Sequence, residues 1–225
     1  MPSPRFYCSE PLHAHQTLTL PESLAHHVRV LRLAAGTQIV LFDGKGGEYS
    51  GALDFNGKIA VCAVSEHIQR EAELAGQITL LQGLPAGDKM DWVVEKAIET
   101  GAQVIAPLQC ERSVIKLTRS SDAERAQKRL LHWEGIVQAA CEQCDRTVFA
   151  TVEPVQNFES YLQKPQKAQL KLLLSPDTDK SLYSALIDSP PQDIILMIGP
   201  EGGHSPEEEA QAQMAGYQIV SLGDR

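Results

Sequence analysis

A short apolar run that ends in a glycine-rich turn constrains this chain more than any other feature. The run is Ile194–Ile198, and the turn is Gly199-Pro200-Glu201-Gly202-Gly203. A helix start follows, because Ser205 suits an N-cap, Pro206 the first helical position and Glu208 the carboxylate of a capping box. A buried strand, a tight loop and a helix N-terminus make a place where backbone amides can meet a ligand. The turn matches neither the G-x-G-x-x-G nor the G-x-x-x-x-G-K-S/T pattern of phosphate-binding loops.

The first 70 residues read as a small β-rich domain. Short alternating or apolar runs are separated by turn clusters, which predicts a small barrel. The expected strands are Gln16–Leu20, Thr37–Phe42, Glu48–Leu53 and Ile59–Val64, and Glu22–Leu31 is the one expected helix. The charged segment Glu66–Gly76 is interpreted as a linker. The sequence therefore predicts two domains, 1–70 and 71–225.

After the linker, strand and helix patterns alternate, which predicts an α/β domain with a mainly parallel sheet covered on both faces. The expected strands are Ile78–Leu84, Val104–Leu108, Leu170–Leu174, Ile194–Ile198 and Gln218–Leu222. The expected helices are Lys89–Thr100, closed by Gly101 at a C-cap position, then Ser121–Cys144 and Ser205–Ala215.

Composition narrows the function classes. No run approaches 18 apolar residues, and the N-terminus lacks the features of a signal peptide, so the cytoplasm is the expected location. An odd number of cysteines, five, fits a reducing compartment. The net charge of −9 argues by itself against a nucleic-acid partner. Arg29 and Arg32 nevertheless stand one helical turn apart, either as a phosphate contact or as a solvated face.

Two further segments carry polar residues at element ends. Arg112 and Ser113 follow an expected strand, where they could hold an anionic or carbonyl group, or Arg112 could pair with Glu111 in a loop. Glu142 and Arg146 end the long helix, where Arg146 also suits the helix dipole. The Cys141-x-x-Cys144 pair lies at that same helix end and has no second pair, so no metal site is expected.

The motifs become specific when they are taken in order. They are Arg5-Phe6-Tyr7, His27-x-x-x-Leu31-Arg32, Leu41-Phe42-Asp43-Gly44, Glu95-Lys96-x-x-Glu99-x-Gly101, Pro107-x-x-x-Glu111-Arg112-Ser113, Ala139-x-Cys141-Glu142-Gln143-x-x-Arg146, Ile198-Gly199-Pro200-Glu201-Gly202-Gly203 and Leu222-Gly223-x-Arg225. This ordered set closely resembles the 16S ribosomal RNA uridine N3-methyltransferase family, in the SPOUT class of knotted methyltransferases. The resemblance runs from about residue 4 to the last residue.

The resemblance implies a fold and partners. An N-terminal PUA-like β-barrel would help to bind RNA, and a C-terminal SPOUT α/β domain would contain a deep trefoil knot, an exception to the rule against knots. The cofactor would be S-adenosylmethionine, the substrate 16S ribosomal RNA in the small subunit, and the active unit a homodimer. Neither a membrane nor a metal is expected as a partner.

The resemblance also implies a cofactor site in three loops, Leu173–Pro176, Ile198–Gly203 and Ser221–Arg225. Glycines there would let the backbone approach adenine and ribose, and a phosphate cradle is absent because this cofactor has no phosphate. The expected cofactor-binding residues are Leu173, Leu174, Ser175, Ile198, Gly199, Pro200, Glu201, Gly202, Gly203, Leu222 and Gly223.

The implied reaction is methyl transfer to the N3 atom of uridine, which must lose its proton. Arg112 is expected near the developing oxyanion, with Glu142 or Glu201 as the base. The expected RNA-binding residues are Arg5, Arg29, Arg32, Arg112, Ser113 and Arg146.

The chain departs from the family pattern at its end. The family continues past Leu-Gly-x-Arg with a Leu-Arg-Thr-Glu-Thr-Ala phrase and a closing helix, whereas this sequence stops at Arg225. The knot and one wall of the cofactor pocket are therefore expected to be incomplete in the chain as given. Two other functions stay open: a non-catalytic RNA-binding or ribosome-assembly protein of the same fold, and a SPOUT methyltransferase that acts on transfer RNA.

Overall fold

The computed structural model describes residues 3–70, 72–187 and 193–223, which fall into two compact units. Unit 1 comprises Met1–Glu73 and Gln138–Phe149, and unit 2 comprises Leu74–Val137 and Ala150–Arg225. The sequence predicted a single boundary near residue 70. The structure differs because the end of the long helix α3 (Ala123–Cys144) belongs to unit 1.

Unit 1 is built on a five-stranded sheet. Its strands are β1 (Arg5–Tyr7), β2 (Thr17–Thr19), β3 (Gln38–Phe42), β4 (Glu48–Asn56) and β5 (Ile59–Ile68), in the order β1-β3-β4-β5-β2, with α1 (Glu22–Val30) between β2 and β3 in sequence. The β1–β3 pair is parallel and the other pairs are antiparallel. The predicted linker start at Glu66 was wrong, because Glu66–Ile68 pair with Glu48–Ser50 and prolong β5.

The core of unit 1 lies between the sheet and α1. Leu24 and Val28 of the helix pack with strand residues such as Leu41 and Leu53, all of them buried. The predicted helix Glu22–Leu31 is confirmed up to Val30, whereas Leu31 is the C-cap of α1 and is 47% exposed.

The segment that follows α3 docks inside unit 1. The Phe149 ring lies 5.0 Å from the ring of Tyr7 and 5.9 Å from that of Phe42. A Cβ atom at Gly44 would come within 2.7 Å of the Phe149 side chain, so glycine is required there, where φ is also +77°. Lys45 and Val148 form an isolated bridge beside this contact.

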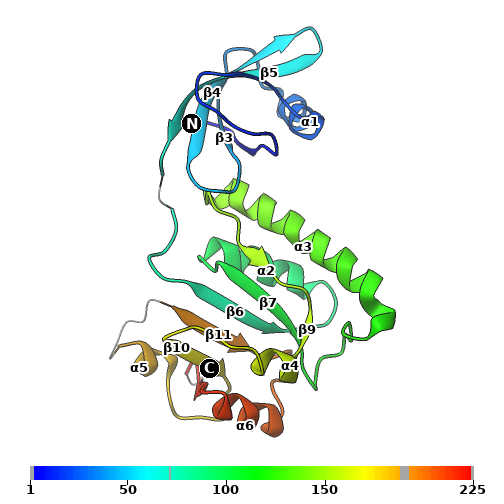
Figure 1. The fold of residues 1–225 in the computed structure, drawn as a ribbon, viewed down its shortest axis with the longest axis vertical. Coiled ribbons are helices and arrows are strands. Elements are labelled where there is room, and N and C mark those ends of the chain that lie inside the picture. The colour runs from blue at the N-terminus through cyan, green and yellow to red at the C-terminus, as the bar shows by residue number, and fades with distance from the viewer. Residues whose placement is uncertain (1–2, 71, 188–192, 224–225) are drawn as a thin grey trace. The chain divides into compact units, whose positions relative to one another are not determined.

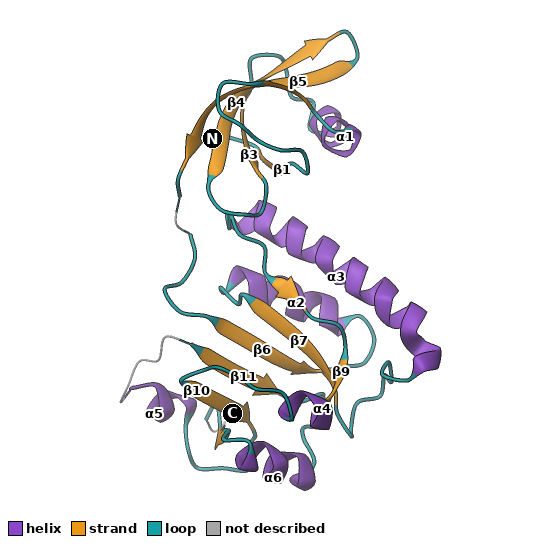
Figure 2. Cartoon of the chain, viewed as in Figure 1, coloured by secondary structure: helices purple, strands orange, loops and turns teal. Residues whose placement is uncertain are grey.

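Unit 2 contains a seven-stranded sheet in which every strand pair is parallel. The strands are β6 (Ile78–Gly83), β7 (Val104–Gln109), β8 (Thr151–Val152), β9 (Gln156–Asn157), β10 (Leu170–Leu174), β11 (Ile194–Ile198) and β12 (Gln218–Val220). The order is β12-β10-β11-β6-β7-β8, with β9 also pairing with β7. The strands β10, β11, β6 and β7 can be followed side by side in Figures 1 and 2. The predicted parallel sheet is confirmed.

Helices cover both faces of this sheet. They are α2 (Lys89–Glu99), α3, α4 (Phe158–Leu162), α5 (Leu182–Ile187) and α6 (Pro206–Met214). On one face Leu173 and Met197 pack with Phe158 of α4 and Ala212 of α6. On the other, Leu172 packs with Leu182 of α5. Among the described residues no helix is both long and apolar enough to cross a membrane.

The strand order positions the site. The chain builds β6 and β7, reaches β8, and then returns to β10 on the far side of β6, and β11 fills the gap between β10 and β6. The register aligns Leu174 of β10 with Ile198 of β11, and Ile198 with Gln82 of β6. The carboxyl ends of these strands therefore meet at one edge of the sheet, where such folds bind ligands.

Candidate functional site

Five loops leave the carboxyl edge of the unit 2 sheet. They are residues 84–88 after β6, 110–113 after β7, 175–176 after β10, 199–205 after β11 and 221–223 after β12. The edge brings together the three predicted cofactor loops, because β12, β10 and β11 are consecutive neighbours. Arg225, predicted as the end of the third loop, lies outside the described residues. Leu222 is exposed, whereas Leu173 and Ser175 are buried at the edge.

The Gly-Pro-Glu-Gly-Gly turn is compressed against its surroundings. The Gly203 N–H donates to the carbonyl of Pro200 at 2.8 Å, and Gly203 has φ +69°. A Cβ at Gly199 would lie 2.9 Å from the carbonyl carbon of Gly203, and one at Gly83 would lie 2.5 Å from the Pro200 ring. The atoms in these contacts belong to the backbone or to a proline ring and cannot rotate away. A side chain at Gly199 or Gly83 would therefore force the turn to move.

The helix start after the turn is confirmed as a capping box. Ser205 Oγ accepts from the Glu208 N–H at 3.3 Å, and Glu208 Oε2 accepts from the Ser205 N–H at 3.1 Å. Glu208 Oε1 also accepts from the Glu111 N–H at 2.8 Å, which ties the loop after β7 to α6. Burial alone would raise the pKa of Glu208, but the nearby His204 ring and the hydrogen bonds from the Glu111 and Ser205 N–H groups hold it below its ordinary value.

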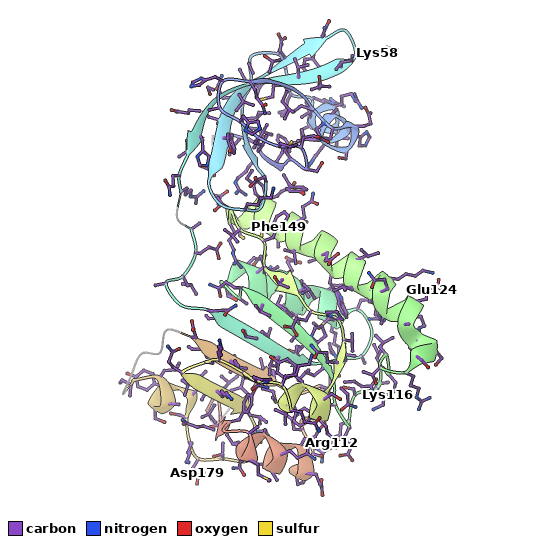
Figure 3. All side chains as sticks on the ribbon, viewed as in Figure 1. Lys58, Arg112, Lys116, Glu124, Phe149 and Asp179 are labelled. Carbon is purple, nitrogen blue, oxygen red and sulfur yellow. The ribbon has the colours of Figure 1, made fainter. Side chains whose placement is uncertain are left out.

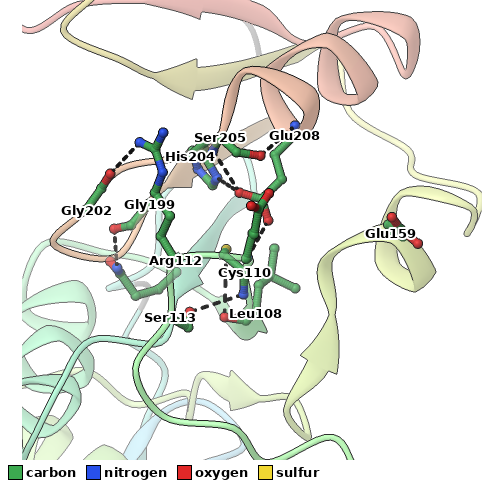
Figure 4. Close-up of polar contacts among 12 residues, drawn as sticks. Leu108, Cys110, Arg112, Ser113, Glu159, Gly199, Gly202, His204, Ser205 and Glu208 are labelled. Atoms are coloured by element: carbon green, nitrogen blue, oxygen red, sulfur yellow. Dashed lines mark hydrogen bonds and ion pairs between the residues drawn. The ribbon is translucent and has the colours of Figure 1, made fainter.

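Arg112 lies beside the turn on the same sheet edge (Figures 3 and 4). Its Nη1 donates to the Gly202 carbonyl at 2.8 Å, and the residue is exposed. A guanidinium group has five N–H donors, so this one contact orients it and leaves others to bind an anion or a carbonyl oxygen. The structure thus places one predicted catalytic residue next to the predicted cofactor loops.

Ser113 has an internal role in the loop after β7. It is buried, and its Oγ accepts from the Cys110 N–H at 3.1 Å. Lys116 Nζ donates to the carbonyls of Cys110 and Glu111, at 3.2 and 3.0 Å. These bonds hold the backbone that carries Arg112. Lys116 was not predicted from the sequence, because a lysine that binds loop carbonyls has no local pattern.

Glu201 fastens the turn to the loop after β6. Its carboxylate accepts from Lys89 Nζ at 2.7 Å and from the Ala86 N–H at 3.1 and 3.2 Å. The hydrogen bond from Lys89 is the main cause that lowers the pKa of Glu201, so the carboxylate is ionised and paired at neutral pH. Lys89 stands at the start of α2, where the helix dipole disfavours a cation. A lysine at this unfavourable position is the sequence feature that could have indicated an acidic partner outside the helix.

Two predicted arginines of unit 1 are internal. Arg5 donates to the carbonyls of Cys141 and Arg146, at 2.6 and 2.8 Å, and lies over the Phe42 ring. Arg146 binds Glu73 through two nitrogens, at 3.0 and 2.5 Å, and the two side chains are 6% and 14% exposed. Both arginines join the end of α3 to the rest of unit 1.

Glu142, a predicted base, also has a partner within unit 1. Its Oε1 accepts from the Tyr7 N–H at 2.9 Å, which links the end of α3 to β1.

Arg29 and Arg32 are exposed, as an RNA contact requires. Arg29 pairs with Glu22, and Arg32 has φ +53° just beyond α1, so it does not continue the helix face.

A buried polar cluster lies beneath the turn and was not anticipated. It consists of Cys110, His204 and Glu208, which offer atoms within 4.8 Å of one another. Neither ring nitrogen of His204 has a hydrogen-bond partner, and Nδ1 lies 3.6 Å from Glu208 Oε2. Burial raises the pKa of the Cys110 thiol to about 12. Its members come from separate segments, so spacing could not reveal it.

Two family models match the chain, one for each part. The model of an RNA methyltransferase domain matches residues 72–225, and the model of an RNA methyltransferase PUA domain matches residues 20–66. The chain belongs to the RNA methyltransferase family. It therefore combines a PUA-like domain with a methyltransferase domain of α/β fold.

This RNA methyltransferase is similar to known proteins over nearly all of its length. The chain is 32% identical over 211 residues to the ribosomal RNA small subunit methyltransferase E of Bacillus subtilis, covering 91% of this chain and 81% of that one. A crystal structure of the protein of that name from Neisseria gonorrhoeae, bound to S-adenosylmethionine, is 36% identical with a TM-score of 0.88, over 99% and 90% of the two chains. A putative methyltransferase of Legionella pneumophila with the same bound cofactor is 30% identical, with a TM-score of 0.89 over 100% and 91%.

Proposed function

We propose that this RNA methyltransferase transfers a methyl group from S-adenosylmethionine to the N3 atom of a uridine in 16S ribosomal RNA of the small subunit, in the cytoplasm. The observation that carries the proposal is the carboxyl edge of the unit 2 sheet, where a compressed glycine turn lies beside the exposed Arg112. The names of the relatives support the ribosomal substrate. The choice of uridine N3 rests on the resemblance of the ordered motifs.

The edge residues fit the proposed cofactor. Ser175, Gly199 and Ser221 follow three neighbouring strands directly, so the backbone of three loops gathers at the edge where we propose that an adenosine binds. Gly203 and Gly223 have positive φ, and a Cβ added at either would meet nothing within 4 Å, which leaves room for a ligand against the backbone. We propose that Leu174–Ser175, Ile198–Gly203 and Leu222–Gly223 hold S-adenosylmethionine, with Leu173 supporting them from the core.

The bound cofactor supplies an electrophilic methyl group on a sulfonium, and its departing thioether needs no acid. The difficulty is the N3 proton of uridine, whose removal leaves negative charge on N3 and on the two neighbouring carbonyl oxygens of the base. Arg112 can stabilise that charge, because Gly202 orients its guanidinium while other N–H groups remain for substrate. Glu201 and Glu142, the candidate bases, are engaged by Lys89 and by the Tyr7 N–H. We therefore rank Arg112 first among the catalytic residues.

We propose that unit 1 contributes to RNA binding through Arg29 and Arg32, because these are its predicted arginines that are exposed. Phosphate-led binding weakens steeply with salt. Replacing either arginine by alanine should reduce affinity and lower the slope of log affinity against log salt by about 1. An affinity that stays constant between low and physiological salt would contradict this interface.

We also propose the trefoil knot and the homodimer that the resemblance implies. The strand order supports the proposal of a knot, because the chain passes from β8 to β10 on the far side of β6 and β11 then lies between β10 and β6. Light scattering of the purified protein tests the dimer, and a monomer mass at micromolar concentration would contradict it.

The test of the function is mass spectrometry of ribosomal RNA from cells with and without this protein. We expect one methyluridine in 16S RNA to disappear and to return with the gene. Unchanged 16S RNA together with saturable S-adenosylmethionine binding would indicate another RNA, and the methylated nucleotide of transfer RNA would then be mapped. No S-adenosylmethionine binding by the full-length protein in calorimetry would indicate a non-catalytic RNA-binding protein.

A further inference from the structure

The buried cluster of Cys110, His204 and Glu208 joins three segments of unit 2. Cys110 directly follows β7, His204 follows the glycine turn, and Glu208 lies in the first turn of α6. The three residues are 1%, 6% and 6% exposed, and each offers one atom within 4.8 Å of the others (Figure 4). Sulfur, imidazole nitrogen and carboxylate oxygen are together a donor set that divalent zinc accepts.

The unpartnered ring nitrogens of His204 indicate that this cluster binds a ligand. Its side chain is 1% exposed, and both ring nitrogens lack a hydrogen-bond partner. Buried polar groups in folded proteins almost always have a partner. Nδ1 is 3.6 Å from Glu208 Oε2, too far for a hydrogen bond, and the ring lies 5.5 Å from that of Phe158. An imidazole with a free lone pair thus faces a thiol and a carboxylate.

Access and charge also suit a cation. A cavity of about 280 Å³ borders the cluster, and both Cys110 and Glu208 line it. Its wall carries three more carboxylates, those of Glu111, Glu159 and Glu207, against the single ammonium of Lys116. Lys116 Nζ is directed to the carbonyls of Cys110 and Glu111. A cation can therefore approach from the cavity, and water there can complete a four-coordinate ion.

We propose that Cys110, His204 and Glu208 bind one zinc ion, with a water from the cavity as the fourth ligand. The Cys110 thiol releases its proton as the Zn–S bond forms. Glu208 keeps its bonds to the Glu111 and Ser205 N–H groups, since each carboxylate oxygen has a second lone pair. The ion would clamp the loop that carries Arg112 to the segment that follows the glycine turn. Its role is structural, and it does not depend on which RNA is methylated.

The test uses the purified protein, dialysed against chelator and then titrated with Zn²⁺, and separately with Co²⁺ as a spectroscopic probe. We expect one zinc per chain by elemental analysis and a higher melting temperature with Zn²⁺. Co²⁺ should give a thiolate-to-metal charge-transfer band together with the visible bands of tetrahedral cobalt. Metal-free protein after both titrations would overturn the proposal.

Variants assign the ligands. Cys110→Ser should abolish the charge-transfer band, and His204→Phe should abolish metal binding and the rise in melting temperature. The matched control is the double variant Cys141→Ser/Cys144→Ser, which removes the Cys-x-x-Cys pair. It should leave the charge-transfer band, the metal binding and the rise in melting temperature unchanged. Since phenylalanine fills the space of His204 beside Phe158, the His204 variant is expected to fold, as circular dichroism would show. A band that survives Cys110→Ser, or disappears in the control, would place the metal elsewhere and refute the site.

Discussion

Two groups of polar residues from the same ordered motif set have opposite surroundings. At the carboxyl edge of unit 2, Arg112 is exposed and makes one bond to the Gly202 carbonyl. In unit 1, Arg146 is buried and binds Glu73 through two nitrogens. The residues of one motif set can therefore have different roles in the structure. Burial and partners separate those that hold the fold together from those that are free to meet a substrate.

The largest effect is expected on stability, when the buried ion pair of Arg146 and Glu73 is broken. Arg146→Ala leaves the Glu73 carboxylate, 14% exposed, without its partner, so the free energy of unfolding should fall by about 3–5 kcal/mol. Urea unfolding followed by circular dichroism measures it. Arg125→Ala is the control, because its pair with Asp122 is exposed on the arginine side and should cost less than about 1 kcal/mol. Unchanged stability with lost methyl transfer would instead make Arg146 an RNA ligand.

The second largest effect is expected on the rate of methyl transfer, when Arg112 at the carboxyl edge of unit 2 is replaced. Arg112→Ala should lower the single-turnover rate of methyl transfer by about 10²–10³, the usual cost of one lost oxyanion donor. Its stability should hardly change, because the side chain is exposed. Arg112→Lys should recover part of the rate, since lysine keeps the charge but loses the planar fork. Arg119→Ala is the control, because Arg119 is another exposed arginine between β7 and α3. Near wild-type turnover by Arg112→Ala would remove Arg112 from the mechanism.

A smaller effect should follow from Glu142, which was predicted as a base. Glu142→Ala leaves the Tyr7 N–H without its acceptor, so stability should fall by about 1–3 kcal/mol. Glu142→Gln keeps an acceptor oxygen and should restore most of that loss. The rate measured on folded protein should be close to wild type for both variants. A large loss of rate in the stable glutamine variant would restore Glu142 as the base.

Local patterns predicted most of the fold. The strands β10 and β11 begin and end where the apolar runs do, and the capping box of Ser205 and Glu208 is confirmed. Such elements are set by neighbouring residues in sequence. The strands β8 and β9, of two residues each, were missed because their existence depends on pairing with β7.

The site was less predictable, since its partners are distant in sequence. Arg5 meets the Cys141 carbonyl across 136 positions, and Glu201 meets Lys89 across 112. No spacing rule connects such residues. The strand order could place the loops at one edge only after the chain's return to β10 was known. Sequence therefore indicated which residues matter, and packing decided what each of them does.

The smallest effect concerns Glu201, whose surroundings lie between the two extremes: it is paired, yet 42% exposed. The hydrogen bond from Lys89 lowers its pKa in the folded state. A carboxyl with a depressed folded pKa contributes stability above its ordinary pKa and loses it as the pH falls through the folded value. The contact between Lys89 and Glu201 should thus be intact at neutral pH and be lost only in acid.

Carbon-13 NMR of the Glu201 carboxyl group measures this directly. The midpoint should lie below the ordinary glutamate value, and Lys89→Ala should raise it toward that value because the main cause of the shift is gone. Lys128→Ala is the control, since Lys128 pairs with Glu124 on α3 and should leave the midpoint unchanged. Cofactor affinity should be constant across neutral pH in wild type. A Glu201 carboxyl that titrates near neutral pH would instead suit a general base, and would move Glu201 from the residues that hold the loops to those that do the chemistry.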